Sequence, residues 1–306
     1  IIFEKNKSDS SLTYDKITLS YGKIPPSIMP KIDRKRFLKL KGMYENTVSS
    51  IFKLNQKLPE QKKIVLIEFN PEIYESLLYE MARNNIQPVL LNFRRPATWS
   101  LNSINILRKT NSLVISPEDI LGKQKLSEIK NQAKIIFDKI KIAFENNHEI
   151  LSNTFVYEDV KFYSIIIELF IRIFRERLEE YMIQILISEE LNHMNHIICG
   201  ISLNLSGETE KTFSQIIKTF PILLLQHAFS NYPKSLEFLD VLDDFKFYKN
   251  KIIVYGDIIH NYLSTSHSIP KKDILVSGSP KYDSFKPIRK KITNKNIPVI
   301  NVTQCF

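Results

Sequence analysis

Three short apolar runs in the last third of the chain place the strongest constraint on its fold. They cover residues 222–225, 251–255 and 273–277, and each one stops in a compact polar turn. Short apolar runs bounded by such turns are typical of buried parallel strands. In open α/β sheets, ligands bind beyond the carboxyl ends of the strands. The turns therefore predict where a functional site would lie.

The first half of the chain alternates strand and helix patterns, which predicts a parallel sheet. Asn70 and Pro71 indicate a helix start, with Asn70 as the N-cap and Pro71 as the first helical residue. Residues 1–32 are polar and are expected to be irregular. The predicted strands cover residues 64–67, 88–92 and 112–116, and the predicted helices cover residues 33–58, 70–84 and a stretch from about 98.

A long segment between residues 117 and 193 has a helical pattern throughout. Its second part, residues 158–192, places apolar residues every three or four positions, and charged residues interrupt it too often for a membrane span. We expect a packed helical insertion, with a partner-binding or membrane-facing helix as the alternative. A strand over residues 196–202 and a helix over 206–220 then restore the alternation.

Composition narrows the function classes only slightly. The chain has 306 residues and a formal charge of +10, in a Lys-rich composition that also fits an ordinary solvated surface. The other interpretation is attraction to a membrane face or to nucleotide phosphates. No basic stretch is interleaved with aromatic residues, so nucleic acid is not expected as a partner. Two distant cysteines, Cys199 and Cys305, form neither a disulfide framework nor a zinc motif, which fits a reducing cytoplasm.

Polar residues that follow the predicted strands are the candidates for chemistry. Gln226 and His227 end one strand, where a histidine can act as a general base or bind a phosphate. Arg94 and Arg95 follow another; they can hold an anion in bidentate fashion or pair with nearby carboxylates. Glu68 follows the first strand and is a possible catalytic carboxylate.

Further candidates lie at a helix start and in glycine turns. Gly207 and Glu208 open a helix whose backbone N–H groups can bind an anion, although Glu208 and Glu210 are also ordinary helix-stabilising charges. Only 7 residues are glycine, and Gly207, Gly256 and Gly278 lie in turns after late strands. His193 and His196 have no third ligand in sight, so no metal site is predicted. Walker, dinucleotide-binding and nucleophile-elbow motifs are absent from the sequence.

The late turns together resemble a known group of enzymes. Gln226-His227-Ala228, Gly256-Asp257 and the turn from Gly278 to Asp283 are similar to the turns of bacterial and archaeal surface-polysaccharide transferases of the GT-B type. The named groups are the CDP-glycerol glycerophosphotransferase-like and capsule-polysaccharide enzymes, with a looser likeness to UDP-N-acetylglucosamine 2-epimerase. Ala228 departs from the glycine that is usual in the family.

The resemblance implies the fold and the organisation of the chain. It implies an α/β fold with a Rossmann-like parallel sheet flanked by helices, the GT-B N-terminal domain, over residues 61–292. A helical insertion is expected at about 117–195, and an N-terminal arm with a basic helix over residues 1–60. Residues 293–306 would be a linker and the first strand of a second domain that is not in this chain. Because that second domain supplies most nucleotide contacts in the family, the chain alone is expected to be inactive.

The resemblance also implies a function and its residues. The chain would be the acceptor-side domain of a transferase in surface polysaccharide biosynthesis, cytoplasmic and at the inner face of the membrane, that needs no cofactor and no metal. Its partners would be a nucleotide-sugar or CDP-polyol donor and a saccharide or lipid-linked acceptor. The alternatives are a UDP-sugar epimerase or hydrolase, and a non-catalytic binding subunit. The catalytic residues would be His227 and Glu208, and the substrate-binding residues Arg94, Arg95, Gln226, Gly207, Gly256, Asp257, Gly278, Ser279 and Asp283.

Overall fold

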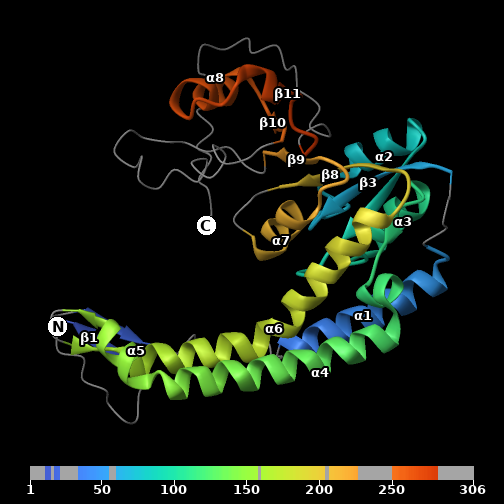
Figure 1. Ribbon diagram of the computed structural model, residues 1–306. Coiled ribbons are helices and arrows are strands. Elements are labelled where there is room, and N and C mark those ends of the chain that lie inside the picture. Colours follow the sequence, from blue (N-terminus) through green and yellow to red (C-terminus); the bar gives the residue numbers. More distant parts are fainter. Residues whose placement is uncertain are drawn as a thin grey trace.

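A parallel sheet of seven strands organises the computed structural model, which describes residues 11–14, 17–20, 34–54, 60–157, 160–203, 207–226 and 250–281. The strand order is β11-β10-β9-β8-β3-β4-β5 (Figure 1). This confirms the predicted Rossmann-like α/β class. The strands are β3 (Lys62–Ile67), β4 (Ile86–Leu91), β5 (Leu113–Val114), β8 (Ile197–Ser202), β9 (Ile222–Leu225), β10 (Ile252–Val254) and β11 (Ile274–Val276).

The strand order reverses direction next to β3. The chain runs from β3 to β4 and β5 on one side, and then returns to place β8, β9, β10 and β11 on the other side. A reversal of this kind leaves a crevice at the carboxyl ends of the two central strands, where doubly wound sheets bind their ligands. Here those two strands are β3 and β8, and we define the crevice as the place at the sheet edge where the residues after Ile67 and Ser202 meet.

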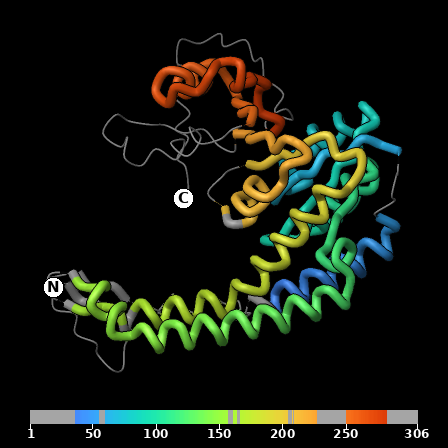
Figure 2. Tube along the Cα trace, viewed as in Figure 1, coloured from blue at the N-terminus to red at the C-terminus, as the bar shows by residue number. Residues whose placement is uncertain are grey.

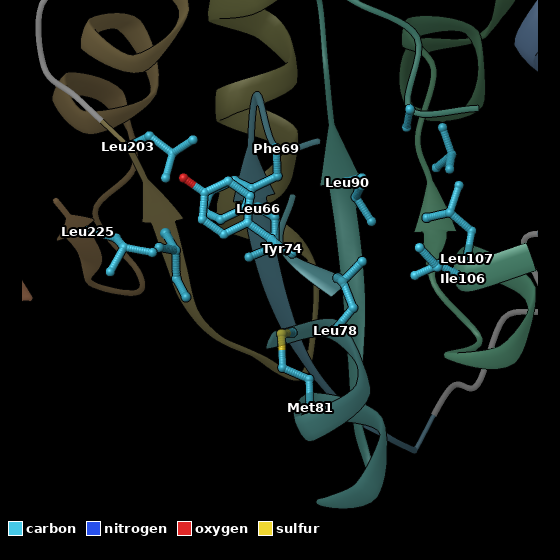
Figure 3. Close-up of a cluster of buried hydrophobic side chains, with 13 residues drawn as sticks. Leu66, Phe69, Tyr74, Leu78, Met81, Leu90, Ile106, Leu107, Leu203 and Leu225 are labelled. Carbon is cyan, nitrogen blue, oxygen red and sulfur yellow. The ribbon is translucent and has the colours of Figure 1, made fainter. Parts of the chain in front are cut away.

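Helices cover both faces of the sheet, which is why its strands are apolar at consecutive positions. Leu66 and Leu90 face a cluster with Leu78 and Met81 of α2 (Glu75–Arg83) and with α3 (Leu101–Lys109), as Figure 3 shows. On the opposite face, Val65, Ile67, Val89 and Leu91 pack against α6 (Tyr163–His193) and α7 (Glu208–Ile216). A third cluster joins β9, β10 and β11 to α8 (Asp257–Ser266).

The predicted helical insertion is a long arm that projects from the sheet (Figures 1 and 2). It consists of α4 (Pro117–Asn146), α5 (His148–Thr154), the short strands β6 (Val156–Tyr157) and β7 (Val160–Lys161), and α6. α4 packs along α6, where the Phe144 ring lies 6.3 Å from the Phe170 ring. No helix among the described residues is long and apolar enough to cross a membrane.

Two predicted helix starts were wrong by a few residues. α2 begins at Glu75 and not at Pro71, because Tyr74 is buried in the core, where its ring centroid lies 4.7 Å from that of Phe69. Asn70 still caps locally, since its Oδ1 accepts a hydrogen bond from the Glu72 N–H at 3.0 Å. α3 begins at Leu101 after its N-cap Ser100, and not at Thr98, which is fully buried.

The N-terminal part also differs from its prediction. The expectation of an irregular segment over residues 1–32 was wrong for β1 (Ser11–Tyr14) and β2 (Ile17–Ser20), which pair antiparallel. The two strands contain leucine, threonine, tyrosine and isoleucine, which favour strands. The polar residues around them led to the prediction of irregular structure. The following helix, α1 (Arg34–Ile51), is shorter than the predicted range of 33–58. The predicted strand at 298–304 lies outside the described residues.

Candidate functional site

The carboxyl end of β3 carries a buried carboxylate. Glu68 follows the strand with a φ of 61°, a left-handed conformation that non-glycine residues rarely adopt. Its N–H donates to the Leu91 carbonyl at 3.1 Å, which fixes the turn against the neighbouring strand β4. Its Oε1 accepts hydrogen bonds from the Phe93 N–H at 2.7 Å and the Arg94 N–H at 3.1 Å. Glu68 thereby shapes the loop that follows β4.

Arg94 bridges two carboxylates across the crevice. Its Nε lies 3.4 Å from Oε2 of Glu68, and its Nη2 donates to Oε1 of Glu210 on α7. Both carboxylates are buried, whereas the Arg94 side chain is 47% exposed. No hydrogen bond joins the Nη1 group to the other described residues. The two carboxylates therefore hold the guanidinium through Nε and Nη2, and the two N–H donors of Nη1 are not used by them.

The start of α7 positions the second carboxylate. Gly207 is the N-cap, and Glu210 is the third helical residue, whose carboxylate folds back over the helix start. A Cβ built at Gly207 would overlap that carboxylate, with the Glu210 Cδ only 2.6 Å away. Carboxylates are favourable at this end of a helix because the first backbone N–H groups carry partial positive charge. Oε2 of Glu210 is nevertheless buried and has no hydrogen-bond partner within the described residues.

Apolar and amide contacts hold the crevice walls together. The Phe93 ring lies 6.3 Å from the Phe213 ring of α7, so the loop after β4 packs directly on that helix. Nδ2 of the buried Asn92 donates to the Phe69 carbonyl at 2.8 Å, which ties the ends of β3 and β4. On the other side of α7, Nε2 of Gln184 donates to Thr209 Oγ1 at 3.3 Å and anchors the helix start to α6.

Burial raises the pKa of Glu68 above its ordinary value of 4.5. Hydrogen bonds from the Phe93 and Arg94 N–H groups and the charge of Arg94 oppose this rise in pKa, while the charge of Glu210 adds to it. Two ionised carboxylates facing one guanidinium would leave a net negative charge in a desolvated place. A proton on Glu68 would remove that excess, and the raised pKa brings this protonation closer to neutral pH.

The late strands supply a second group of predicted residues. Gln226 is buried at the end of β9, and its Oε1 accepts the Tyr255 N–H at 2.9 Å. Gly256 is the N-cap of α8 with a φ of −171°, an extended conformation open to any residue, and Asp257 is exposed at the first helical position. Gly278 has a φ of 78°, which a glycine allows without strain.

These two groups are separated along the sheet edge. Gly278 and Ser279 follow β11, which stands four strands from β3. At about 4.8 Å per strand, that is roughly 19 Å, too far for direct contact with the Arg94 cluster. The sheet therefore brings together Arg94 and Gly207, with Gln226 two strands away, and leaves the β11 turn at its far end.

Of the remaining predicted site residues, the structure describes some and not others. Arg95 is exposed beside Arg94. Glu208 is the first residue of α7, but its side chain lies outside the described part of the structure. His227 and Asp283 also fall outside the described residues. The described residues contain no group of three His, Cys, Asp or Glu side chains that could hold a metal ion.

The sequence underestimated two acidic residues of the crevice. Glu210 was interpreted as a helix-stabilising charge, and Glu68 as one possible catalytic group, but both contact Arg94. For Arg94, the ion pair with nearby carboxylates was one of the two interpretations left open by the sequence. A glutamate three positions after a glycine N-cap was the available signal for Glu210.

Comparison with solved structures finds distant similarity to a glycosyltransferase. The similar structure is the crystal structure of a glycosyltransferase from Rickettsia africae ESF-5, with 10% sequence identity and a TM-score of 0.33. The match covers 72% of this chain and 43% of that one, so the present chain spans less than half of its length. No family model and no curated protein matches the chain.

Proposed function

We propose that this chain is the acceptor-side domain of a transferase that uses a nucleotide-sugar or CDP-polyol donor in surface polysaccharide biosynthesis. The observation that supports this most is the Arg94 guanidinium, held by Glu68 and Glu210 at the β3–β8 crevice. Doubly wound sheets bind nucleotide-like ligands at this point of reversal. The resemblance of the late turns to surface-polysaccharide transferases supplies the reaction class.

Arg94 would contact a phosphate group of the donor or of an anionic acceptor. A guanidinium fixed on one side by carboxylates loses little rotational freedom when it binds a phosphate on the other side. Its Nη1 group supplies two donors, and the exposed Arg95 supplies further positive charge. The start of α7 lies on the same crevice, but the Glu210 carboxylate already folds back over it, so the arginines supply the positive charge for the anion.

Glu68 would adjust the charge of this site. With both carboxylates ionised, the cluster around Arg94 is negative by one charge and repels a phosphate. With a proton on Glu68, the cluster is neutral and the Arg94 donors remain in place. Because burial raises the Glu68 pKa, phosphate affinity is expected to increase as the pH falls from neutral toward that pKa.

The reaction would be the attack of an acceptor hydroxyl on the activated donor. A new bond forms from the acceptor oxygen to the sugar carbon, or to the phosphorus of a polyol phosphate. The bond to the leaving nucleotide phosphate breaks, and the leaving oxygen takes the electron pair. By resemblance to the family, His227 would accept the hydroxyl proton and Glu208 would orient the hydroxyl. Gln226, Gly256, Asp257, Gly278, Ser279 and Asp283 would line the rest of the donor site, opposite a second domain.

Nucleotide binding by Arg94 variants tests the proposal. Titration calorimetry of the protein with CDP and UDP should give a Kd about tenfold higher or more for Arg94→Ala, and a smaller loss for Arg94→Lys, which keeps the charge but not the fork. Arg83→Ala is the matched control, because Arg83 pairs with Glu80 on the exposed face of α2. Equal affinity of the Arg94→Ala variant and the control for both nucleotides would remove the central support.

A turnover assay distinguishes a transferase from an epimerase or a hydrolase. Incubation of the full protein with a labelled nucleotide-sugar, with and without acceptor, should give product only with acceptor. Product without acceptor indicates an epimerase or a hydrolase. Normal turnover by His227→Ala would show that His227 is not the base.

A non-catalytic binding subunit is the second candidate, and the projecting arm favours it. The arm exposes apolar side chains on both of its long helices: Ile135, Ile142, Leu169 and Ile173. A binding subunit would bind no nucleotide at Arg94, and its partner would be lost on replacement of these residues by aspartate.

A further inference from the structure

The helix α1 buries a charged pair and exposes apolar side chains, which is the reverse of the usual arrangement. Its inward face carries the ion pair between Lys41 and Glu45, together with Val48. Its outward face exposes Leu40 at 54%, Met43 at 60% and Ile51 at 68%. Leucine, methionine and isoleucine at such exposure lose the free energy that their burial would give. An outward apolar stripe on a helix with a buried ion pair indicates that something else covers the stripe.

A tryptophan emerges beside this stripe. The Tyr44 hydroxyl donates to the Thr98 carbonyl at 2.8 Å, and the Glu45 carboxylate accepts the Ala97 N–H at 2.7 Å. These bonds attach α1 to the loop before α3. Trp99, the next residue of that loop, is 69% exposed, and Leu101 after it is also exposed. Tyr44 itself is partly exposed, so the apolar side chains of α1 continue onto the loop.

The exposed charged residues of α1 all have the same sign, whereas Glu72 lies beside Trp99 and Leu101, where its carboxylate accepts a hydrogen bond from the Ser100 hydroxyl. Arg36, Lys39 and Lys53 are exposed on or just after α1. The one acidic residue between 34 and 54 is Glu45, which is buried and engaged by Lys41 and Ala97. The outward face of α1 therefore combines apolar side chains with positive charge and carries no carboxylate.

We propose that this surface binds the face of an anionic lipid bilayer. We define the α1 surface as Leu40, Met43, Tyr44, Ile51, Trp99 and Leu101, with the basic residues at its border. Interfacial helices place an apolar stripe in the acyl boundary and lysine or arginine beside the anionic headgroups. Tryptophan and tyrosine favour that same depth, because their rings are apolar with one polar group. A second copy of the chain is the weaker alternative, because two like-charged borders would then face each other.

The proposal goes beyond the transferase activity and does not depend on it. Nevertheless, the loop between β4 and α3 carries both Arg94 at the crevice and Trp99 at the α1 surface. A bilayer bound at Trp99 would therefore lie near the crevice, where a lipid-linked acceptor would have to enter.

Trp99 is the only tryptophan of the chain, so its fluorescence reports this surface alone. Titration with vesicles of phosphatidylglycerol mixed with phosphatidylcholine should shift its emission to shorter wavelength, and brominated lipid should quench it. Vesicles of phosphatidylcholine alone should give little binding. Raising the salt concentration should weaken the binding, because ions screen the attraction beyond roughly 10 Å at 0.1 M.

Variants assign the binding to named residues. Leu40→Asp and Ile51→Asp should each weaken vesicle cosedimentation by about tenfold or more, because aspartate both removes apolar area and adds repulsion. Arg36→Gln and Lys39→Gln should each weaken it by about fivefold at low salt. Ile258→Asp on α8 is the matched control, since Ile258 is 84% exposed far along the sheet from α1. If an aspartate variant fails to fold by circular dichroism, Met43→Gln and the two charge variants still test the surface.

Three outcomes would overturn the proposal. One is the absence of any Trp99 shift and of cosedimentation with phosphatidylglycerol vesicles. Another is equal loss of binding in the Ile258→Asp control, which would indicate a nonspecific effect. The last is a dimer in solution that Leu40→Asp dissociates while vesicles have no effect, which would assign the surface to a second copy of the chain. None of these outcomes bears on nucleotide binding at Arg94, so the two proposals fail separately.

Discussion

The guanidinium of Arg94 contacts the carboxylate of Glu210, which lies 116 residues further along the chain. The contact joins the loop after β4 to the start of α7 across the reversal of the strand order. Glu68 completes the arrangement from the end of β3. Two buried carboxylates thus fix one arginine, and the energetics of the site depend on how their charges are balanced.

Glu210→Gln should lower the pKa of Glu68. The charge of Glu210 contributes to raising that pKa, and glutamine removes the charge while it keeps the shape of the side chain. A carbon-13 NMR titration of the Glu68 carboxyl group measures the change. Glu80→Gln serves as the control, because Glu80 is exposed on α2 and should leave the Glu68 titration unchanged. An unchanged Glu68 pKa in Glu210→Gln would mean that the two carboxylates do not interact.

Gly207→Ala should destabilise the fold by about 1–3 kcal/mol, because the new Cβ meets the Glu210 carboxylate and forces it from Arg94. Gly256→Ala is a close control: Gly256 is also a helix N-cap, but a Cβ there meets nothing within 4 Å. Urea denaturation should show a change within about 0.5 kcal/mol for Gly256→Ala.

A double-mutant cycle checks that the effect acts through Glu210. With Glu210→Ala in place, the added methyl group at Gly207 has no carboxylate to displace, so its cost should fall by at least about 1 kcal/mol. Additive free energies of unfolding would assign the cost of Gly207→Ala to the backbone alone.

Glu68 should make stability depend on pH. Its pKa in the folded protein is raised above 4.5, so the folded state holds this proton more tightly than the unfolded state. The stabilising contribution is full below about pH 4.5 and is lost as the pH rises through the raised pKa. Denaturation of the wild type and Glu68→Gln across this range should show a steeper decline with rising pH in the wild type. Parallel curves would contradict the raised pKa.

Glu45→Ala should destabilise the protein by about 3–5 kcal/mol. The change leaves the buried Lys41 ammonium and the Ala97 N–H without their shared acceptor. Glu145→Ala provides the control, since Glu145 forms an exposed pair with Lys141 at the same helical spacing and should cost about 0.5 kcal/mol or less. Thermal unfolding measures both, and similar melting temperatures would mean that the α1 ion pair is not buried in solution.

The strands of the sheet could be predicted from sequence with good accuracy, because each is a short apolar run and most of their residues are buried. Helix starts were less predictable. The Asn70-Pro71 signal is a sound local rule, but burial of Tyr74 against Phe69 delays α2 to Glu75. The antiparallel pair of β1 and β2 was missed because its few strand-forming residues lie in a polar segment.

From the sequence, the residues of the crevice could be named only as candidates, without the contacts between them. Glu210 fits the pattern of an ordinary carboxylate in the first turn of a helix. That pattern does not indicate a contact with Arg94, which lies 116 positions earlier in the chain. Its contact with Arg94 exists because Phe93 packs on Phe213 and brings the β4 loop onto α7. For α1, the sequence predicted a basic helix, and the tertiary structure decided which side chains of that helix face solvent: Leu40 and Ile51 are both exposed.

The sequence by itself determined the alternation of strands and helices, because hydrophobic periodicity and capping are local properties. It also determined that polar and charged residues follow the strands. Only the tertiary structure decided which of these residues meet, since the order β8-β3-β4 depends on how the crossovers pack and not on any single segment. Burial then decided their chemistry: the same Glu68 that would be an ordinary carboxylate in solution is desolvated beside Arg94 and Glu210 in the folded chain.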